Sequence, residues 1–208
     1  MFNQNINYSG MQYDTKERFC SYWHQINEVQ TLKPLHILEI GKGNGFVSTY
    51  LKNNGYKMCS LDLEYLLKPE VAGSVLNIPF KNESFDVVIC CEVLEHIPFE
   101  NFQKGLMEVN RVAKNNAIVS LPDLSPAWKY IITVPRLGEF NFLIPKPRFR
   151  AVKFTFNGEH YWNISNRGFP LKKIVNLIKL SGFHIVKQYR VFEMPWHRFF
   201  ILAKTNAI

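Results

Sequence analysis

The sequence lacks several features that would assign it to a familiar class. No apolar run is long enough to span a bilayer, and the start of the chain has no basic stretch followed by an apolar one, so we expect a soluble, cytoplasmic protein. The four cysteines form neither a disulfide framework nor a zinc-binding spacing, and the residues call for no metal ion. Because 47% of the 208 residues are apolar, we expect a single domain over residues 1–208 rather than a disordered chain.

Acidic residues are scarce relative to basic ones. Lys and Arg number 25 against 17 Asp and Glu, which gives a formal charge of +8. A basic balance favours an anionic partner, either nucleic acid or an anionic membrane surface. Charge alone does not choose between them.

Two common nucleotide-binding patterns are missing, although the chain has a glycine-rich turn. An apolar strand ending at residue 40 is followed by Gly41, Gly43 and Gly45. Glycine lets a ligand lie against the backbone, so such a turn between a strand and a helix indicates a nucleotide-like ligand. A dinucleotide fold needs its third glycine where this chain has Phe46, and no Gly-Lys-Ser/Thr tripeptide of a phosphate loop follows.

The pattern of apolar residues predicts alternating strands and helices. The N-terminal segment, residues 1–33, is expected to be helical, with Asp14 as N-cap and Glu17 completing a capping box. The next elements are predicted at residues 35–40, 45–53, 56–61, 73–76, 85–90, 100–112 and 117–121. This βαβα order predicts a parallel sheet with helices on both faces, whose ligand lies beyond the carboxyl ends of the strands.

Residues 123–160 interrupt that rhythm and are predicted to form an insertion after strand five. They contain several prolines, scattered aromatics and basic residues. We favour a lid over an acceptor, with a patch for anionic lipid or an RNA-binding surface as alternatives. A helix at 170–180 and strands at 183–192 and 198–204 follow, and the short connection between the strands predicts an antiparallel hairpin at the sheet edge.

Five sequence motifs occur in one order along the chain, among them the glycine turn and the acidic end of the second strand. They lie at residues 38–45, 61–64, 77–80, 84–97 and 108–122. In this combination the chain resembles the class I S-adenosylmethionine-dependent methyltransferases of the type 11/23-like kind, nearest to the branch that methylates small molecules and quinone-like or lipid-like substrates. The resemblance implies an α/β, Rossmann-like, doubly wound sheet of seven mostly parallel strands with an antiparallel C-terminal hairpin. It also implies methyl transfer from S-adenosyl-L-methionine, with S-adenosyl-L-homocysteine as product.

The resemblance carries over to individual residues. Glu39 would organise the turn and attract the donor's ammonium group, and Asp62 would accept hydrogen bonds from both ribose hydroxyls. Ser74 stands where many relatives have an aspartate near the adenine. The complete set of expected cofactor-binding residues is Glu39, Gly41, Gly43, Gly45, Asp62, Leu63, Ser74, Leu76, Asn77, Cys91 and Glu92.

His96, His160 and Tyr161 are the candidate catalytic residues. An acceptor that must lose a proton needs a general base, and an imidazole suits that role. Each has a structural alternative: His96 bracing the following helix, and His160 and Tyr161 packing the insertion on the core. Cys90 and Cys91 follow no proline, and no Asn/Asp-Pro-Pro-aromatic tetrapeptide follows strand four, so two devices of base methylation are absent.

Two other functions compete with transfer to a small-molecule or lipid-like acceptor. The first is an RNA or protein methyltransferase that docks through the basic insertion, with Arg148 and Arg150 among its contacts. The second is a non-catalytic module that binds the cofactor. Retention of Glu39, Asp62 and the glycine turn argues against loss of the cofactor but not against loss of the acceptor.

Overall fold

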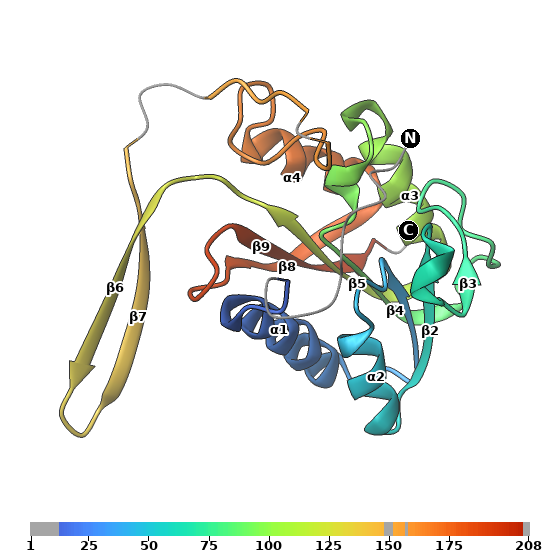
Figure 1. Ribbon diagram of the computed structural model, residues 1–208, viewed down its shortest axis with the longest axis horizontal. Coiled ribbons are helices and arrows are strands. Elements are labelled where there is room, and N and C mark those ends of the chain that lie inside the picture. The colour runs from blue at the N-terminus through green and yellow to red at the C-terminus, as the bar shows by residue number, and fades with distance from the viewer. Residues whose placement is uncertain (1–12, 148–151, 157, 206–208) are drawn as a thin grey trace.

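A seven-stranded sheet forms the centre of the protein (Figure 1). The computed structural model describes residues 13–147, 152–156 and 158–205. The strand order is β3-β2-β1-β4-β5-β9-β8. The strands are β1 (His36–Ile40), β2 (Lys57–Asp62), β3 (Val71–Ala72), β4 (Phe85–Cys91), β5 (Ala113–Pro122), β8 (Phe183–Arg190) and β9 (His197–Lys204).

The pairing confirms the predicted fold class. Strands β1 to β5 pair in parallel, whereas β9 pairs antiparallel with both β5 and β8. The order reverses at β1, which lies between β2 and β4, so the switch point falls where β1 and β4 end side by side. Ile40 there is the register partner of Cys90.

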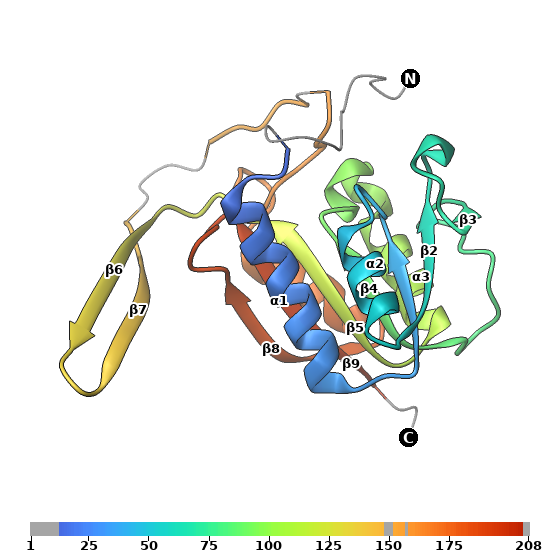
Figure 2. The same cartoon turned by 60° about the horizontal axis from the view of Figure 1, so that its bottom comes forward.

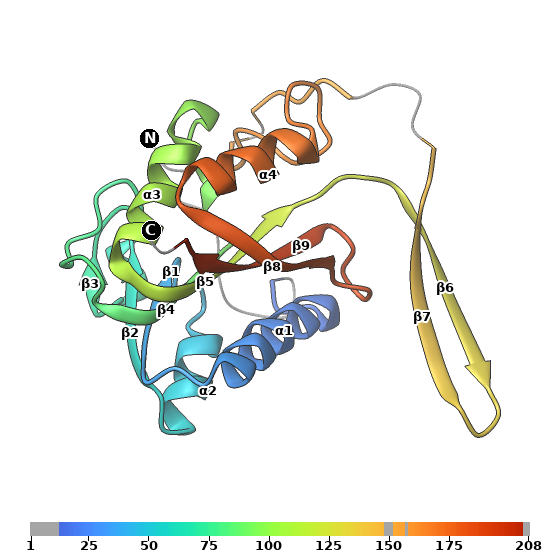
Figure 3. The same ribbon diagram turned by 180° about the vertical axis from the view of Figure 1, so that it is seen from behind.

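Helices cover both faces of the sheet, as Figures 1 and 3 show. On one face α1 (Lys16–Leu32) and α2 (Phe46–Asn53) bury an apolar cluster that includes Val29 and Leu51. On the other, α3 (Phe102–Val112) and α4 (Leu171–Leu180) pack on a larger cluster around Trp162. Short 3-10 turns lie at η1 (Tyr65–Leu67), η2 (Leu94–His96) and η3 (Phe99–Asn101).

Two predicted details of these elements are wrong. The N-cap of α1 is Thr15, whose hydroxyl accepts from the Arg18 amide, because the Asp14 carboxylate instead accepts from the Asn44 side chain at 2.7 Å. The strand predicted at 73–76 is a turn in which Asn77 N donates to Ser74 O, and the short strand β3 lies just before it.

The predicted insertion contains a two-stranded antiparallel hairpin formed by β6 (Ala127–Val134) and β7 (Gly138–Pro145). Figures 1 and 2 show it projecting from the body, away from α2 and β1. Large apolar side chains on it, such as Ile131, Leu137 and Phe142, are exposed. No helix in the described part of the chain is both long and apolar enough to cross a membrane.

Asp86, the second residue of β4, joins the starts of three strands. Its Oδ2 accepts from the amides of Leu35 and His36 at 3.0 and 2.8 Å, and its Oδ1 accepts from Lys114 Nζ at 2.9 Å. These hydrogen bonds outweigh its partial burial and lower the pKa of Asp86 to about 2.

We expect Asp86→Ala to lower the free energy of unfolding at pH 7 by about 1–2 kcal/mol, since it removes hydrogen bonds to a charged acceptor. The folded pKa lies below the unfolded one, so this contribution is complete above an unfolded pKa of about 3.9 and disappears as the pH falls through the folded value. Urea unfolding of variant and parent from pH 7 to pH 3 measures it. A difference that stays constant, or grows, toward acid pH would contradict the assignment.

Candidate functional site

The glycine turn leaves β1 in a backbone conformation that other residues rarely adopt. Gly41, Gly43 and Gly45 have φ values of 80°, 53° and 73°. A Cβ at Gly41 would lie 2.3 Å from Val93 Cγ2, so the segment after β4 packs directly on the turn after β1. Gly41 N also donates to Leu61 O at 2.9 Å, which ties the turn to β2.

Glu39 lies at the base of this turn, inside the sheet. Its side chain is buried, and burial raises the pKa of Glu39 to about 8, while a hydrogen bond from Ser48 opposes that rise. Its Oε2 has no hydrogen-bond partner among the described residues. An unpaired buried carboxyl oxygen is costly, and a ligand's ammonium group would satisfy it. The glycine turn without side chains and the unpaired Oε2 of Glu39 therefore fit S-adenosylmethionine, the expected methyl donor.

Asp62 ends β2 beside the glycine turn. Its Oδ1 accepts from Glu64 N at 2.9 Å, which fixes the carboxylate, and the side chain is only partly buried. Leu63, the next residue, is 53% exposed. The carboxylate is thus held in place by the backbone at the strand end while it remains accessible to a ligand.

The residues expected near an adenine ring form the turn after β3. Ser74 Oγ accepts from Leu76 N at 3.2 Å, so the hydroxyl caps its own turn. Leu76 packs partly buried against the core, and Asn77 is exposed. Their roles in adenine binding remain predictions.

Cys91 is the last residue of β4, where it pairs with Ser120 of β5, and Glu92 follows it. Glu92 has a φ of 53°, and its carboxylate accepts from Ser120 Oγ at 2.8 Å and lies 3.5 Å from His197 Nε2. Burial raises the pKa of Glu92 to about 7. Burial also raises the pKa of the Cys91 thiol, so this cysteine is a packed thiol and not an activated nucleophile.

The sequence patterns did not predict that residues at the start of α1 contact the glycine turn and lie near Glu92. Asp14 binds Asn44 in the glycine turn, and Arg18 lies over the Tyr13 ring at 4.1 Å from its centre. The Arg18 charge lowers the pKa of Glu92 against the larger effect of burial. The polar residues before the apolar helix pattern were the available signal, but nothing in their spacing connects them to residue 44 or 92.

Two of the three candidate catalytic side chains, those of His96 and His160, meet, and the backbone of Tyr161 lies beside them. His96, at the end of η2, has Nδ1 3.0 Å from Glu159 O and its ring centre 4.9 Å from that of His160. Burial, followed by the nearby His160, lowers the pKa of His96. Tyr161 N donates to Glu95 O at 2.8 Å, while the Tyr161 ring packs on Phe156. The fold therefore brings the segment after the hairpin to the end of β4.

The remainder of the insertion lies elsewhere. Strand β6 contacts the β8–β9 connection, where Lys129 Nζ donates to Glu193 O at 2.9 Å. Arg148 and Arg150, expected to contact RNA, lie outside the described residues. What meets the candidate site is residues 158–164, anchored by the fully buried Trp162, whose Nε1 donates to Ile97 O at 3.2 Å.

Comparison with known proteins gives consistent matches. Residues 38–121 match the family model described as "Methyltransferase domain". The ubiquinone biosynthesis O-methyltransferase of Rickettsia canadensis is 26% identical over 176 residues, which cover 78% of this chain and 71% of that protein.

Solved structures are similar in fold at low identity. An S-adenosylmethionine-dependent methyltransferase from Clostridium acetobutylicum superposes with a TM-score of 0.62 and 10% identity, over 94% of this chain and 95% of the other. The 1,6-didemethyltoxoflavin-N1-methyltransferase of Burkholderia thailandensis, solved with bound 1,6-didemethyltoxoflavin and S-adenosylhomocysteine, gives a TM-score of 0.55 and 16% identity, over 91% of this chain and 86% of the other.

We expect Gly41→Ala to destabilise the protein by more than the roughly 1–2 kcal/mol that a positive φ costs an alanine, because the new methyl group also meets Val93. Gly55→Ala is the matched control, since Gly55 has a φ of 89° and open space around its Cβ position. Urea unfolding compares the two, and the double variant Gly41→Ala/Val93→Ala should recover part of the excess. Equal losses at both glycines would show that the close approach of Val93 is unimportant.

Proposed function

Because the chain belongs to the class I S-adenosylmethionine-dependent methyltransferases, we propose that it transfers the donor's methyl group to a small-molecule acceptor of the quinone-like or lipid-like kind. The observation that carries the donor assignment is the orphaned Oε2 of Glu39 beneath a glycine turn. The matches to ubiquinone biosynthesis O-methyltransferases support the acceptor class.

The residues at the strand ends have complementary tasks in this proposal. Glu39 attracts the ammonium group of the donor, and Asp62 accepts hydrogen bonds from its ribose hydroxyls, since a carboxylate offers two oxygens to two donors. The glycine turn lets the donor lie against the backbone. When bound, the donor supplies a methyl group on a sulfonium centre and is released as S-adenosylhomocysteine.

The acceptor is proposed to lie on the side of His96, His160 and Tyr161. Methyl transfer is an in-line displacement that depends on positioning, and an acceptor hydroxyl must also lose its proton. Both imidazoles are partly buried beside the end of β4. Burial and then His160 lower the pKa of His96, while Glu159 and, to a smaller extent, Asp62 raise it.

We expect Asp62→Asn to weaken binding of S-adenosylhomocysteine by about 10- to 100-fold, because hydrogen bonds to a charged acceptor are each worth roughly 1.5–3 kcal/mol. Asn keeps the oxygen that accepts from Glu64 N, so the turn should remain folded. Isothermal titration calorimetry measures the affinity. The control is Glu64→Gln, an exposed carboxylate two residues along the same loop, which should bind like the parent; an unchanged affinity in Asp62→Asn would remove the ribose assignment.

A labelled-donor screen tests the acceptor. The parent protein and Asp62→Asn are each incubated with methyl-labelled S-adenosylmethionine and separate pools of hydroquinones and phenols, fatty acids, RNA and proteins. We expect label in the quinol and phenol pool, strongly reduced in the variant. Label confined to RNA or protein would favour the macromolecular alternative, and intact donor binding without transfer to any pool would favour a non-catalytic module.

A further inference from the structure

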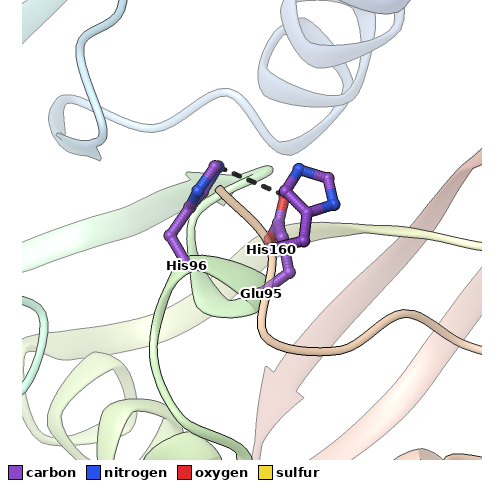
Figure 4. Close-up of side chains that lie close together, drawn as sticks. All are labelled: Glu95, His96 and His160. Atoms are coloured by element: carbon purple, nitrogen blue, oxygen red, sulfur yellow. Dashed lines mark ion pairs between the residues drawn. The ribbon is translucent and has the colours of Figure 1, made fainter. Parts of the chain in front are cut away.

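Three potential metal ligands meet at the end of β4. Glu95 and His96 belong to η2, and His160 comes from the segment after the hairpin. One ligand atom of each lies within 4.8 Å of those of the other two. Figure 4 shows the three side chains converging from these two segments. Their separation in the sequence explains why the spacing of residues predicts no metal site.

Glu95 gives a second, independent observation. Its side chain is 0% exposed, and among the described residues its carboxyl oxygens have no side-chain partner apart from the neighbouring carboxyl group of Glu92. Oε1 lies 3.8 Å from His96 Nε2. A buried carboxyl group without partners is rare because its desolvation is uncompensated, and a bound cation compensates it directly.

Both histidines have the outer hydrogen bond that is typical of metal ligands. His96 Nδ1 is 3.0 Å from Glu159 O, and since a carbonyl can only accept, Nδ1 carries the proton and Nε2 the lone pair. His160 Nδ1 is 2.8 Å from Asn163 Oδ1, and Asn163 is itself buried. Metal-bound imidazoles usually donate their second N–H to such an oxygen, which fixes ring and tautomer.

The donor set selects a class of ion. Two imidazoles and one carboxylate suit zinc and its neighbours in the first transition row, whereas magnesium prefers oxygen ligands alone. Zinc bonds of about 2.1 Å in a tetrahedral site put ligand atoms about 3.4 Å apart. The present atoms lie within 4.8 Å of one another, so a bound ion would draw them closer together.

We propose that Glu95, His96 and His160 bind a divalent transition-metal ion of the zinc type. Three protein ligands leave at least one coordination position for water or a substrate oxygen. The ion also links η2 to residues 158–164, reinforcing the hydrogen bonds from Tyr161 N to Glu95 O and between His96 and Glu159 O.

A role in catalysis follows if the protein methylates a hydroxyl, and this step rests on the proposed function. A coordinated acceptor hydroxyl loses its proton to water more readily because the cation stabilises the oxygen's negative charge. The oxygen lone pair then forms the new O–CH3 bond, and the electron pair of the breaking C–S bond returns to sulfur.

Metal binding is tested without donor or acceptor. Chelator-treated protein that carries no affinity tag is titrated with Zn²⁺ by calorimetry and with Co²⁺ by visible absorption, with Mg²⁺ as a comparison ion. We expect one Zn²⁺ per chain, a visible absorption spectrum typical of four-coordinate Co²⁺, and much weaker binding of Mg²⁺. His160→Asn and Glu95→Gln should each weaken Zn²⁺ binding by at least about 100-fold, above the 10- to 100-fold typical for loss of an outer partner.

His184→Asn is the matched control, because His184 is an exposed histidine on β8. It should bind Zn²⁺ like the parent, and circular dichroism should show all variants folded. Equal Zn²⁺ affinity in His160→Asn, Glu95→Gln and the parent would overturn the site. If the site binds Zn²⁺ but chelation leaves methyl transfer unchanged, the catalytic role of the ion is wrong. If Zn²⁺ binds but no acceptor is methylated, the proposed function fails and the metal site stands.

Discussion

The parallel pairing of β1 and β4 is the constraint on which the site depends. With Ile40 opposite Cys90, both strands turn at the same edge of the sheet, and Val93 packs onto Gly41. That contact places the glycine turn beside Glu92 and η2. Because side chains alternate along a strand, a slip of one residue would carry Glu39 from its buried position to the opposite face. The register, more than any single side chain, assembles the site.

Strand β4 uses acidic residues in opposite ways at its two ends. At its start, Asp86 is surrounded by donors, and its pKa falls to about 2, so its charge favours the folded state. Beyond its end, burial raises the pKa of Glu92 to about 7. Burial and the nearby Glu92 carboxylate together raise the pKa of Glu95 well above its usual range. Buried acids with perturbed pKa values cost stability and gather at functional sites, where ligands compensate them.

The insertion divides into two parts with different surroundings. The β6–β7 hairpin projects from the body, with exposed apolar side chains such as Ile131 and Phe142 (Figure 1). The segment that follows returns to the core, where Trp162 packs edge-on against Phe99 and Phe102 and anchors His160 near η2. Composition alone does not separate these parts, because both are rich in aromatic residues.

The sequence by itself determined most of the order of strands and helices, though not β6 and β7 or the place of β3. It also determined the parallel sheet with its C-terminal hairpin and the glycine turn after β1, because these depend on local periodicity and on residues close together in the chain. Only the tertiary structure decided that Thr15 caps α1 while Asp14 binds Asn44. It also brought the ring centres of His96 and His160 to within 4.9 Å of each other. It also left the buried Glu95 oxygens, within the described part of the chain, with no side-chain partner but the Glu92 carboxyl. Such contacts join segments far apart in the chain, and their geometry is set by the packing of the whole sheet, which no local pattern encodes.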